Sequence, residues 1–281
     1  GKKIMLVDIG KAHLYAPVEG EVYVDLPPEK YQEGKCAKLK YTLYGMRAAA
    51  SNWEKEYSGT LEEIGFRVGR ASTCTFFHPE WKVSIVVHGD DFVMAGSEDK
   101  LRKVEKALRN KYPVKMRGLL GPDANDDKEA EILNRKVFWI DGRIEFEADA
   151  KHVVQMLQDM NMEDCNSGIL PGSQKEGEGG DESEALGREN AWRYRSVVAR
   201  ANYLAQDRPD IRYSVKELCR KMSNPNADDW KALKKLCRYL QGSPQLRQKT
   251  GENEGLPGVV DVYVDSDWAG WRGTREANNG L

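Results

Sequence analysis

The stretch VSIVVHGDDFVMA, residues 83–95, decides how this chain can fold. Its two apolar runs, Val83 to Val87 and Phe92 to Ala95, flank the polar segment His88-Gly89-Asp90-Asp91. Apolar runs of this length around a short segment that contains glycine predict a β-hairpin with a tight turn. Two adjacent aspartates are therefore expected at a hairpin tip.

Strand and helix patterns precede this hairpin. Ile4 to Val7 is a short apolar run that ends at Asp8, and Glu21 to Leu26 alternates as a half-buried strand does. Apolar residues then recur at helical spacing from Arg47 to Ile64, and Gly65 supplies a left-handed stop. The N-terminal part is therefore expected to mix strands and helices.

The same mixture continues after the hairpin. Ser97 is expected to cap a helix with acidic residues in its first turn and an apolar stripe. Asp141-Gly142, between two apolar runs, predicts a second hairpin, followed by an amphipathic helix that starts near Val153. Three further helices are expected at 194–205, 211–222 and 229–240. The fold class is α+β.

Composition excludes several classes of protein. The 281 residues include 43 Lys and Arg against 45 Asp and Glu, and 40% are hydrophobic, which suits one large or two modest globular domains. No apolar window is long enough to cross a membrane. The five cysteines include no Cys-x-x-Cys pair, so neither a disulfide framework nor a zinc ribbon is expected. The protein is therefore expected in a reducing compartment. The ends, Gly1 and Leu281, are expected to be cuts within a longer protein.

Adjacent carboxylates at a hairpin tip repel each other and lose hydration, so a cation such as Mg²⁺ is their natural counter-charge. Asp-Asp pairs also occur at 126–127 and 228–229, and such pairs are usually solvated loop charges. Asp90-Asp91, however, lies between two strand-like runs, and Asp8 ends another. Three carboxylates at strand ends can converge on two metals about 3.5–4 Å apart, the arrangement used in phosphoryl or nucleotidyl transfer.

Short motifs follow one another in order over nearly the whole chain. They are Val7-Asp8-Ile9, Lys38-Leu39-Lys40, Leu43-Tyr44-Gly45, Trp53, Gly65-Phe66, His88-Gly89-Asp90-Asp91-Phe92, Tyr194-Arg195-Ser196, Tyr203-Leu204, Arg208-Pro209-Asp210-Ile211, Arg238-Tyr239-Leu240 and Asp265-Ser266-Asp267-Trp268-Ala269-Gly270. This ordered set resembles the reverse transcriptase region of copia-type LTR retrotransposon Pol polyproteins. The resemblance implies an RNA-directed DNA polymerase.

The resemblance also implies a right-hand polymerase with a palm, a thumb and further parts. The expected domains are a palm with incomplete fingers at 1–116, the palm end and thumb at 117–171, a flexible acidic linker at 172–190, a helical connection at 191–256 and the start of a truncated ribonuclease H-like domain at 257–281. Asp265 matches the first carboxylate of the family's ribonuclease H site. Its partner carboxylates are expected beyond Leu281, which leaves that site incomplete.

In this family the three palm aspartates bind two Mg²⁺ ions, which Mn²⁺ can replace. Here they match Asp8, Asp90 and Asp91, which the resemblance makes the catalytic and metal-binding residues. The positions implied for nucleotide binding are Ile9, Gly10, Lys11, His13 and Arg47. The first three would offer backbone amides to the incoming phosphates.

The chain departs from the family pattern at three places. His88-Gly89 stands where the family usually has Tyr-Val, and His13 stands where it has an aromatic residue that excludes the 2′-hydroxyl. The Gln and Arg of a family motif before Trp53 are lost, and Arg47 is expected to keep part of that charge.

Two alternatives to an active polymerase stay open. One is a catalytically inactive or domesticated nucleic-acid-binding relic of the same fold, and the other is a two-metal phosphoesterase that uses water as its nucleophile. The partners implied are an RNA template, a DNA primer, dNTPs and other parts of the Pol polyprotein, with no membrane. The implied location is intracellular, either in cytoplasmic virus-like particles or in the nucleus.

Overall fold

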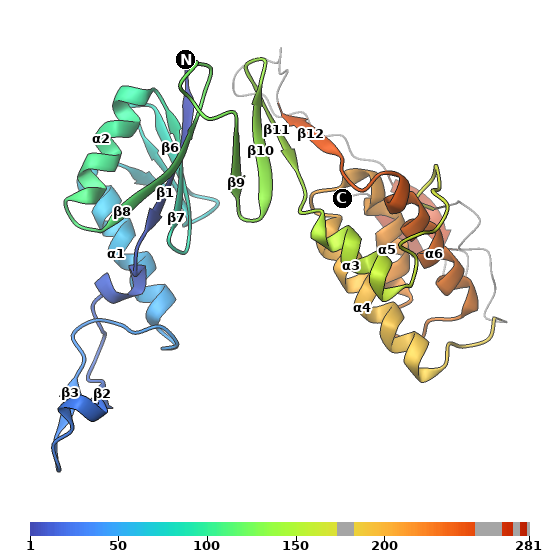
Figure 1. The fold of residues 1–281 in the computed structure, drawn as a ribbon, viewed down its shortest axis with the longest axis horizontal. Helices are drawn as coiled ribbons and strands as arrows, with labels where there is room; N and C mark the ends of the chain where they lie inside the picture. Colours follow the sequence, from blue (N-terminus) through green and yellow to red (C-terminus); the bar gives the residue numbers. More distant parts are fainter. Residues whose placement is uncertain (173–182, 251–265, 272–275, 280–281) are drawn as a thin grey trace. The chain divides into compact units, whose positions relative to one another are not determined.

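A computed structural model describes residues 1–172, 183–250, 266–271 and 276–279 of the chain (Figure 1). The chain divides into two compact units, Gly1–Ala130 and Glu131–Leu281. Each unit has its own hydrophobic core. The mixed architecture confirms the predicted combination of antiparallel sheets and helices.

The first unit is built on a six-stranded sheet with the order β4-β5-β6-β7-β1-β8, in which all neighbours are antiparallel. Its strands are β1 (Lys3–Ile9), β4 (Arg67–Val68), β5 (Thr75–His78), β6 (Val83–His88), β7 (Asp91–Gly96) and β8 (Val114–Leu120). The first strand of the chain thus lies between β7 and β8, which are much later in the sequence (Figure 1).

Two helices, α1 (Ala49–Ile64) and α2 (Glu98–Arg109), pack with this sheet into one core (Figure 1). The apolar spacing predicted α1 correctly, and Gly65 ends it with φ 107°, a conformation that glycine adopts without a steric penalty. Ser97 does precede α2, but its hydroxyl bonds the Asp99 carboxylate at 2.6 Å and caps no backbone amide. The predicted side-chain cap is therefore wrong.

The segment between β1 and α1 contains short elements. They are the 3-10 turns η1 (Ala12–Tyr15) and η2 (Pro28–Lys30) and the strands β2 (Tyr23–Asp25) and β3 (Cys36–Lys38), which pair with each other. The strand predicted at 21–26 is confirmed in a shorter form. It stops before Pro27, whose ring fixes the backbone and removes a donor.

The second unit contains a four-stranded sheet with the order β12-β11-β10-β9. Its strands are β9 (Glu129–Ile132), β10 (Arg135–Ile140), β11 (Arg143–Glu147) and β12 (Arg247–Thr250). Asp141 and Gly142 join β10 to β11 with φ values of 48° and 79°, as a type I′ turn requires. The predicted second hairpin is confirmed.

Four helices form the core of the second unit: α3 (Lys151–Asp159), α4 (Arg188–Leu204), α5 (Arg212–Arg220) and α6 (Ala227–Gly242), with η3 (Pro209–Ile211) between α4 and α5. The predicted helices are confirmed, but α4 begins six residues before its predicted start at 194, whereas the other ends shift by one or two residues. Val153 and Met156 of α3 are buried in the same core as Tyr194 and Leu233. The helix predicted for the thumb thus shares a core with helices predicted for the connection.

Several predictions fall on parts of the chain outside the described residues. These are the centre of the acidic linker (173–182), much of the ribonuclease H-like segment and Asp265. Beyond them, β13 (Ser266–Trp271) and β14 (Glu276–Asn279) pair antiparallel. None of the helices in the described parts is long and apolar enough to cross a membrane.

Candidate functional site

The hairpin of β6 and β7 places its two aspartates at the end of the six-stranded sheet. His88 pairs with Asp91, so Gly89 and Asp90 form the two-residue turn, and Gly89 has φ 63°. A positive φ at the first central residue is the feature that makes glycine preferred in such turns. The predicted hairpin tip is confirmed.

The neighbouring strand brings the third aspartate to the same place. Asp8 is the register partner of Asp91 in the antiparallel pair β1–β7. Val7 and Phe92, which flank these aspartates, are buried in the core, so strand alternation turns both carboxylates to the opposite face of the sheet. We refer to Asp8, Asp90 and Asp91 as the hairpin carboxylates.

Two hydrogen bonds hold the hairpin tip from outside the hairpin. The indole N–H of Trp53, a buried residue of α1, donates to the carbonyl oxygen of Gly89 at 2.7 Å. The backbone N–H of Ile9 donates to the carbonyl oxygen of Asp90 at 2.9 Å. The turn is therefore fixed relative to both α1 and β1.

One basic side chain contacts the hairpin carboxylates. Arg117 of β8 donates from Nη2 to Oδ1 of Asp8 at 2.7 Å. The Asp8 side chain is mostly buried, at 16% exposed, whereas that of Arg117 is 53% exposed. Sequence analysis missed this contact, because no local pattern relates two residues on separate strands.

The electrostatics of Asp91 indicate uncompensated negative charge. Burial raises the pKa of the Asp91 carboxyl above its ordinary value, and the charges of Asp90 and Asp8 add to the increase. Arg117 and His88 oppose the increase but do not cancel it. A carboxylate in this setting gains from further positive charge nearby.

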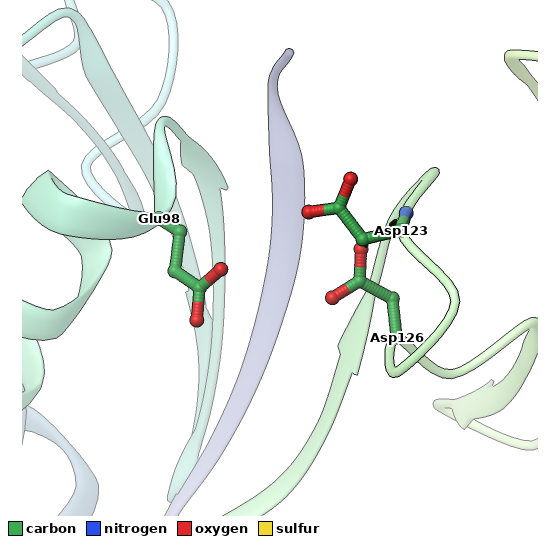
Figure 2. Close-up of side chains that lie close together, drawn as sticks. All are labelled: Glu98, Asp123 and Asp126. Carbon is green, nitrogen blue, oxygen red and sulfur yellow. Dashed lines mark hydrogen bonds between the residues drawn. The ribbon is translucent and has the colours of Figure 1, made fainter.

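The most compact acidic group lies elsewhere in this unit. Among the described residues, three ligand atoms of His, Cys, Asp or Glu lie within 4.8 Å of one another only in Glu98, Asp123 and Asp126 (Figure 2). The hairpin carboxylates do not approach one another that closely in this conformation.

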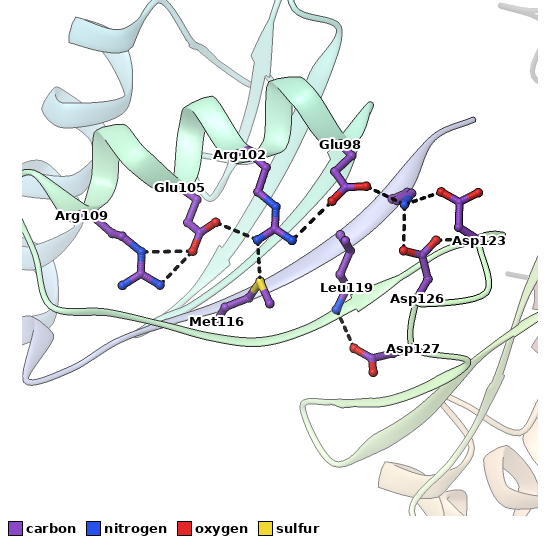
Figure 3. Close-up of polar contacts among 10 residues, drawn as sticks. Glu98, Arg102, Glu105, Arg109, Met116, Leu119, Asp123, Asp126 and Asp127 are labelled. Atoms are coloured by element: carbon purple, nitrogen blue, oxygen red, sulfur yellow. Dashed lines mark hydrogen bonds and ion pairs between the residues drawn. The ribbon is translucent and has the colours of Figure 1, made fainter.

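The ammonium group of Lys3 bonds all three members of this second acidic group. Its Nζ lies 2.7 Å from a carboxylate oxygen of each of Glu98, Asp123 and Asp126, and the three contacts converge on one nitrogen in Figure 3. These hydrogen bonds raise the pKa of Lys3 above its ordinary value. We refer to these four residues as the Lys3 cluster. It ties β1 to α2 and to the loop after β8, and nothing in the sequence pattern signals it.

Part of the basic face of α2 also has partners within the protein. Arg102 contacts Glu98 and Glu105, and Arg109 contacts Glu105 (Figure 3). Lys111, just after the helix, pairs with Glu63 of α1. These ion pairs are typical of a solvated, charge-paired helix face and less typical of a surface that binds phosphate.

Three of the predicted nucleotide-binding positions, Ile9, Gly10 and Lys11, lie at the end of β1 and directly after it. The amide of Ile9 donates to Asp90, as described above, and that of Gly10 donates to the carbonyl oxygen of Pro113 at 3.0 Å. Lys11 has a left-handed backbone with φ 57°. Two of the three predicted phosphate-binding amides thus already have acceptors in this conformation.

The two predicted nucleotide-binding side chains lie farther along the segment before α1. The His13 ring lies 4.7 Å from the Tyr44 ring, and its Nδ1 is buried without a hydrogen-bond partner. Thr42 donates its hydroxyl to the carbonyl oxygen of His13. Arg47, just before α1, is exposed.

A family model described as reverse transcriptase (RNA-dependent DNA polymerase) matches residues 1–174, which include the whole six-stranded sheet. The chain belongs to this reverse transcriptase family. The resemblance deduced from the short motifs is thereby confirmed.

The curated relatives of this reverse transcriptase chain include transposon polyproteins. It is 28% and 26% identical to the retrovirus-related Pol polyproteins from transposons RE2 and RE1 of Arabidopsis thaliana, each over 99% of this chain. It is 24% identical to the Pol polyprotein from transposon TNT 1-94 of Nicotiana tabacum over 98% of this chain. The chain spans about a fifth of the length of these relatives, which is 18% of the first two and 21% of the third.

Proposed function

We propose that this chain is the polymerase part of a copia-type Pol polyprotein and catalyses RNA-directed DNA synthesis. In this reaction the 3′-hydroxyl of a DNA primer attacks the α-phosphate of a dNTP that is paired with an RNA template, and pyrophosphate leaves. The observation that carries the proposal is the register pairing of Asp8 with Asp91, which brings three aspartates to one end of the sheet of a reverse transcriptase family member.

The donor set at this place suits Mg²⁺ or Mn²⁺. Carboxylate oxygens are ligands that these hard cations prefer, and the negative charge around Asp91 is only partly compensated. Asp8, Asp90 and Asp91 would hold the ions. Two bound divalent cations would favour attack by the primer hydroxyl and neutralise charge on the triphosphate.

The protein's own contribution is positioning. The strands β1 and β7 fix Asp8 and Asp91 relative to each other through their backbone ladder. The bond from Trp53 to Gly89 limits movement of the turn that carries Asp90. Such preorganisation lowers the cost of bringing the reacting groups together.

We assign the nucleotide-binding role to the segment that leaves β1. Lys11 and Arg47 would supply positive charge to the triphosphate. The amides of Ile9 and Gly10 would bind phosphate only after they release the carbonyl oxygens to which they donate in this structure. His13, packed beside Tyr44, would contact the sugar.

We assign the six-stranded sheet with α1 and α2 to the palm. The predicted thumb, connection and ribonuclease H-like segment, with Asp265, are retained as proposals for the remainder of the chain. The other parts of a Pol polyprotein would be its partners, inside the cell in virus-like particles or in the nucleus.

Primer extension on an RNA template with dNTPs and Mg²⁺ tests the proposed function. Asp90→Asn should reduce extension at least about a hundredfold, because it weakens the metal site. Asp141→Asn is the matched control, since it makes the same chemical change at a hairpin tip where asparagine also tolerates a positive φ. It should leave extension unchanged.

Other outcomes would favour the alternatives. A parent chain that binds primer–template without extending it would be the non-catalytic relic. Hydrolysis of phosphodiesters that depends on Asp90, without nucleotide incorporation, would indicate a phosphoesterase. Equal extension by the parent and Asp90→Asn would contradict the assignment of the hairpin carboxylates.

A further inference from the structure

An irregularity in β8 brings Arg117 to the hairpin carboxylates. Along the β1–β8 pair, Val7 is opposite Met116 and Leu6 is opposite Gly118, so the register shifts and Arg117 is the extra residue. A β-bulge of this kind re-aims the side chain of the extra residue, and bulges are frequent beside active sites. The bulge explains why Arg117 reaches Asp8.

The contact of Arg117 differs from those of Lys3 and Arg102. Lys3 is saturated by three carboxylates, and Arg102 contacts two. Arg117 forms one ion pair, with Asp8, although Asp90 and Asp91 also lie within its electrostatic reach. One guanidinium cannot neutralise three carboxylates, so the group retains a net negative charge.

We propose that Arg117 is a positioning residue that holds the Asp8 carboxylate while no divalent cation is bound and releases it when one binds. This inference rests on the proposed function, because it takes the hairpin carboxylates as the metal ligands. Arg117 and the cation then compete for the same oxygen, Oδ1 of Asp8. The residue therefore sets the affinity of the site for its metal.

The exposure of Arg117 makes this exchange feasible. Its side chain is about half exposed, so water can solvate the guanidinium after release and the ion pair is partly screened. A more deeply buried pair would resist exchange, because separation would leave an uncompensated charge. Removing the competitor is expected to tighten metal binding roughly five- to tenfold.

Titration of the full chain with Mn²⁺ in a calorimeter, without nucleic acid or nucleotide, tests this proposal. Arg117→Gln should bind Mn²⁺ about five- to tenfold more tightly than the parent. Arg117→Lys keeps the charge and should stay within about threefold of the parent. Lys115→Gln is the matched control, because Lys115 is the register partner of Asp8 in β8 but forms no ion pair with it among the described contacts.

The outcomes separate this proposal from the proposed function. If Asp8→Asn abolishes Mn²⁺ binding while Arg117→Gln leaves it unchanged or weaker, the role of Arg117 is wrong and the metal site stands. If Lys115→Gln tightens Mn²⁺ binding as much as Arg117→Gln does, the effect comes from net charge alone and the proposal is overturned. Mn²⁺ binding that survives both Asp8→Asn and Asp91→Asn would overturn the metal site itself.

A second measurement guards against a folding defect in the variants. Saturating Mn²⁺ stabilises a folded protein in proportion to the logarithm of its binding constant. The Mn²⁺-dependent rise in the thermal unfolding midpoint should therefore be larger for Arg117→Gln than for the parent. An equal or smaller rise would contradict competition between Arg117 and the metal.

Discussion

Two groups of three carboxylates lie in the described part of the first unit, and a basic side chain from β1 or β8 contacts each group. In the Lys3 cluster the ammonium group is nearly buried, at 7% exposed, and contacts all three acids at 2.7 Å. The hairpin carboxylates meet the half-exposed guanidinium of Arg117, which bonds only Asp8. The Lys3 cluster is compact and shares one nearly buried cation, whereas the hairpin carboxylates are less tightly grouped and one of them bonds a half-exposed cation.

The difference teaches that proximity of acids is a poor guide to a metal site. The Lys3 cluster has the tighter spacing, but its internal cation already satisfies the carboxylates, so its role is structural. The hairpin carboxylates are less tightly grouped, and their basic partner, Arg117, is half exposed and bonds only Asp8 among them. Availability of the oxygens, more than their spacing, separates a binding site from an ion cluster.

The largest expected effect would come from matched changes in the two groups. Asp8→Asn should lower the rate of primer extension about a thousandfold, equivalent to about 4 kcal/mol of transition-state stabilisation, with little change in thermal stability. Asp126→Asn should do the reverse: it lowers the unfolding midpoint and leaves the rate within about twofold at a permissive temperature. Single-turnover extension and thermal denaturation measure both. If Asp126→Asn lowers the rate of primer extension more than Asp8→Asn does, the distinction between the two groups is wrong.

Removal of the internal cation should show the structural role of the Lys3 cluster. Lys3→Met keeps most of the side-chain volume but leaves three acids without their common partner. The unfolding midpoint should fall by several degrees, because like charges then repel at close range. Lys2→Met, at an exposed neighbouring position, is the control and should leave the midpoint unchanged. Equal midpoints for the two variants would mean that the ion cluster contributes nothing measurable.

A smaller effect is expected from loosening the hairpin tip. Trp53→Phe removes the N–H that bonds Gly89 in a buried position, which should cost about 1–2 kcal/mol of stability. Extension should fall up to about tenfold, since Asp90 loses part of its positioning. Trp81→Phe is the control, because Trp81 stacks on His78 and has no bond to the turn. A similar loss of extension in both variants would show that the bond to Gly89 has no special part in positioning.

The smallest expected effect is a pH dependence of the Lys3 cluster. Hydrogen bonds from Lys3 hold the pKa values of Glu98 and Asp126 below their ordinary values of 4.5 and 3.8. These carboxyls bind fewer protons when folded, so their stabilisation is present above the ordinary pKa values and is lost as the pH falls through the lowered ones. The difference in unfolding midpoint between the parent and Lys3→Met should therefore narrow from about pH 5 to about pH 3. A difference that widens on acidification would contradict this sign.

Local signals predicted much of the fold. Gly65 ended α1 and Asp141-Gly142 joined β10 to β11 as expected, because both depend on backbone conformations that only certain residues adopt easily. The position of Ser97 was also correct, but its hydroxyl found the Asp99 carboxylate in place of a backbone amide. A sequence indicates the candidate for a cap, whereas the side-chain rotamer decides its partner.

The candidate site was predictable in part. Asp8, Asp90 and Asp91 stood out because each ends or joins an apolar strand, and the order of motifs gave the family. Their actual electrostatic environment was not predictable, since Arg117 enters through a register shift between strands that are far apart in sequence. The bond from Trp53 to Gly89 was missed because it joins α1 to a turn that is distant in sequence.

The sequence by itself determined the helices, the strand that ends at Asp8, the hairpin that carries two aspartates, the hairpin at Asp141-Gly142 and the family. These features follow from periodicity, from glycine conformations and from motif order, all of which act over short stretches of chain. Only the tertiary structure decided that β1 lies between β7 and β8, and that Lys3 saturates one acidic group while Arg117 bonds a single member of the other. Those outcomes depend on strand register and packing among distant segments, where a shift of one residue redirects a side chain.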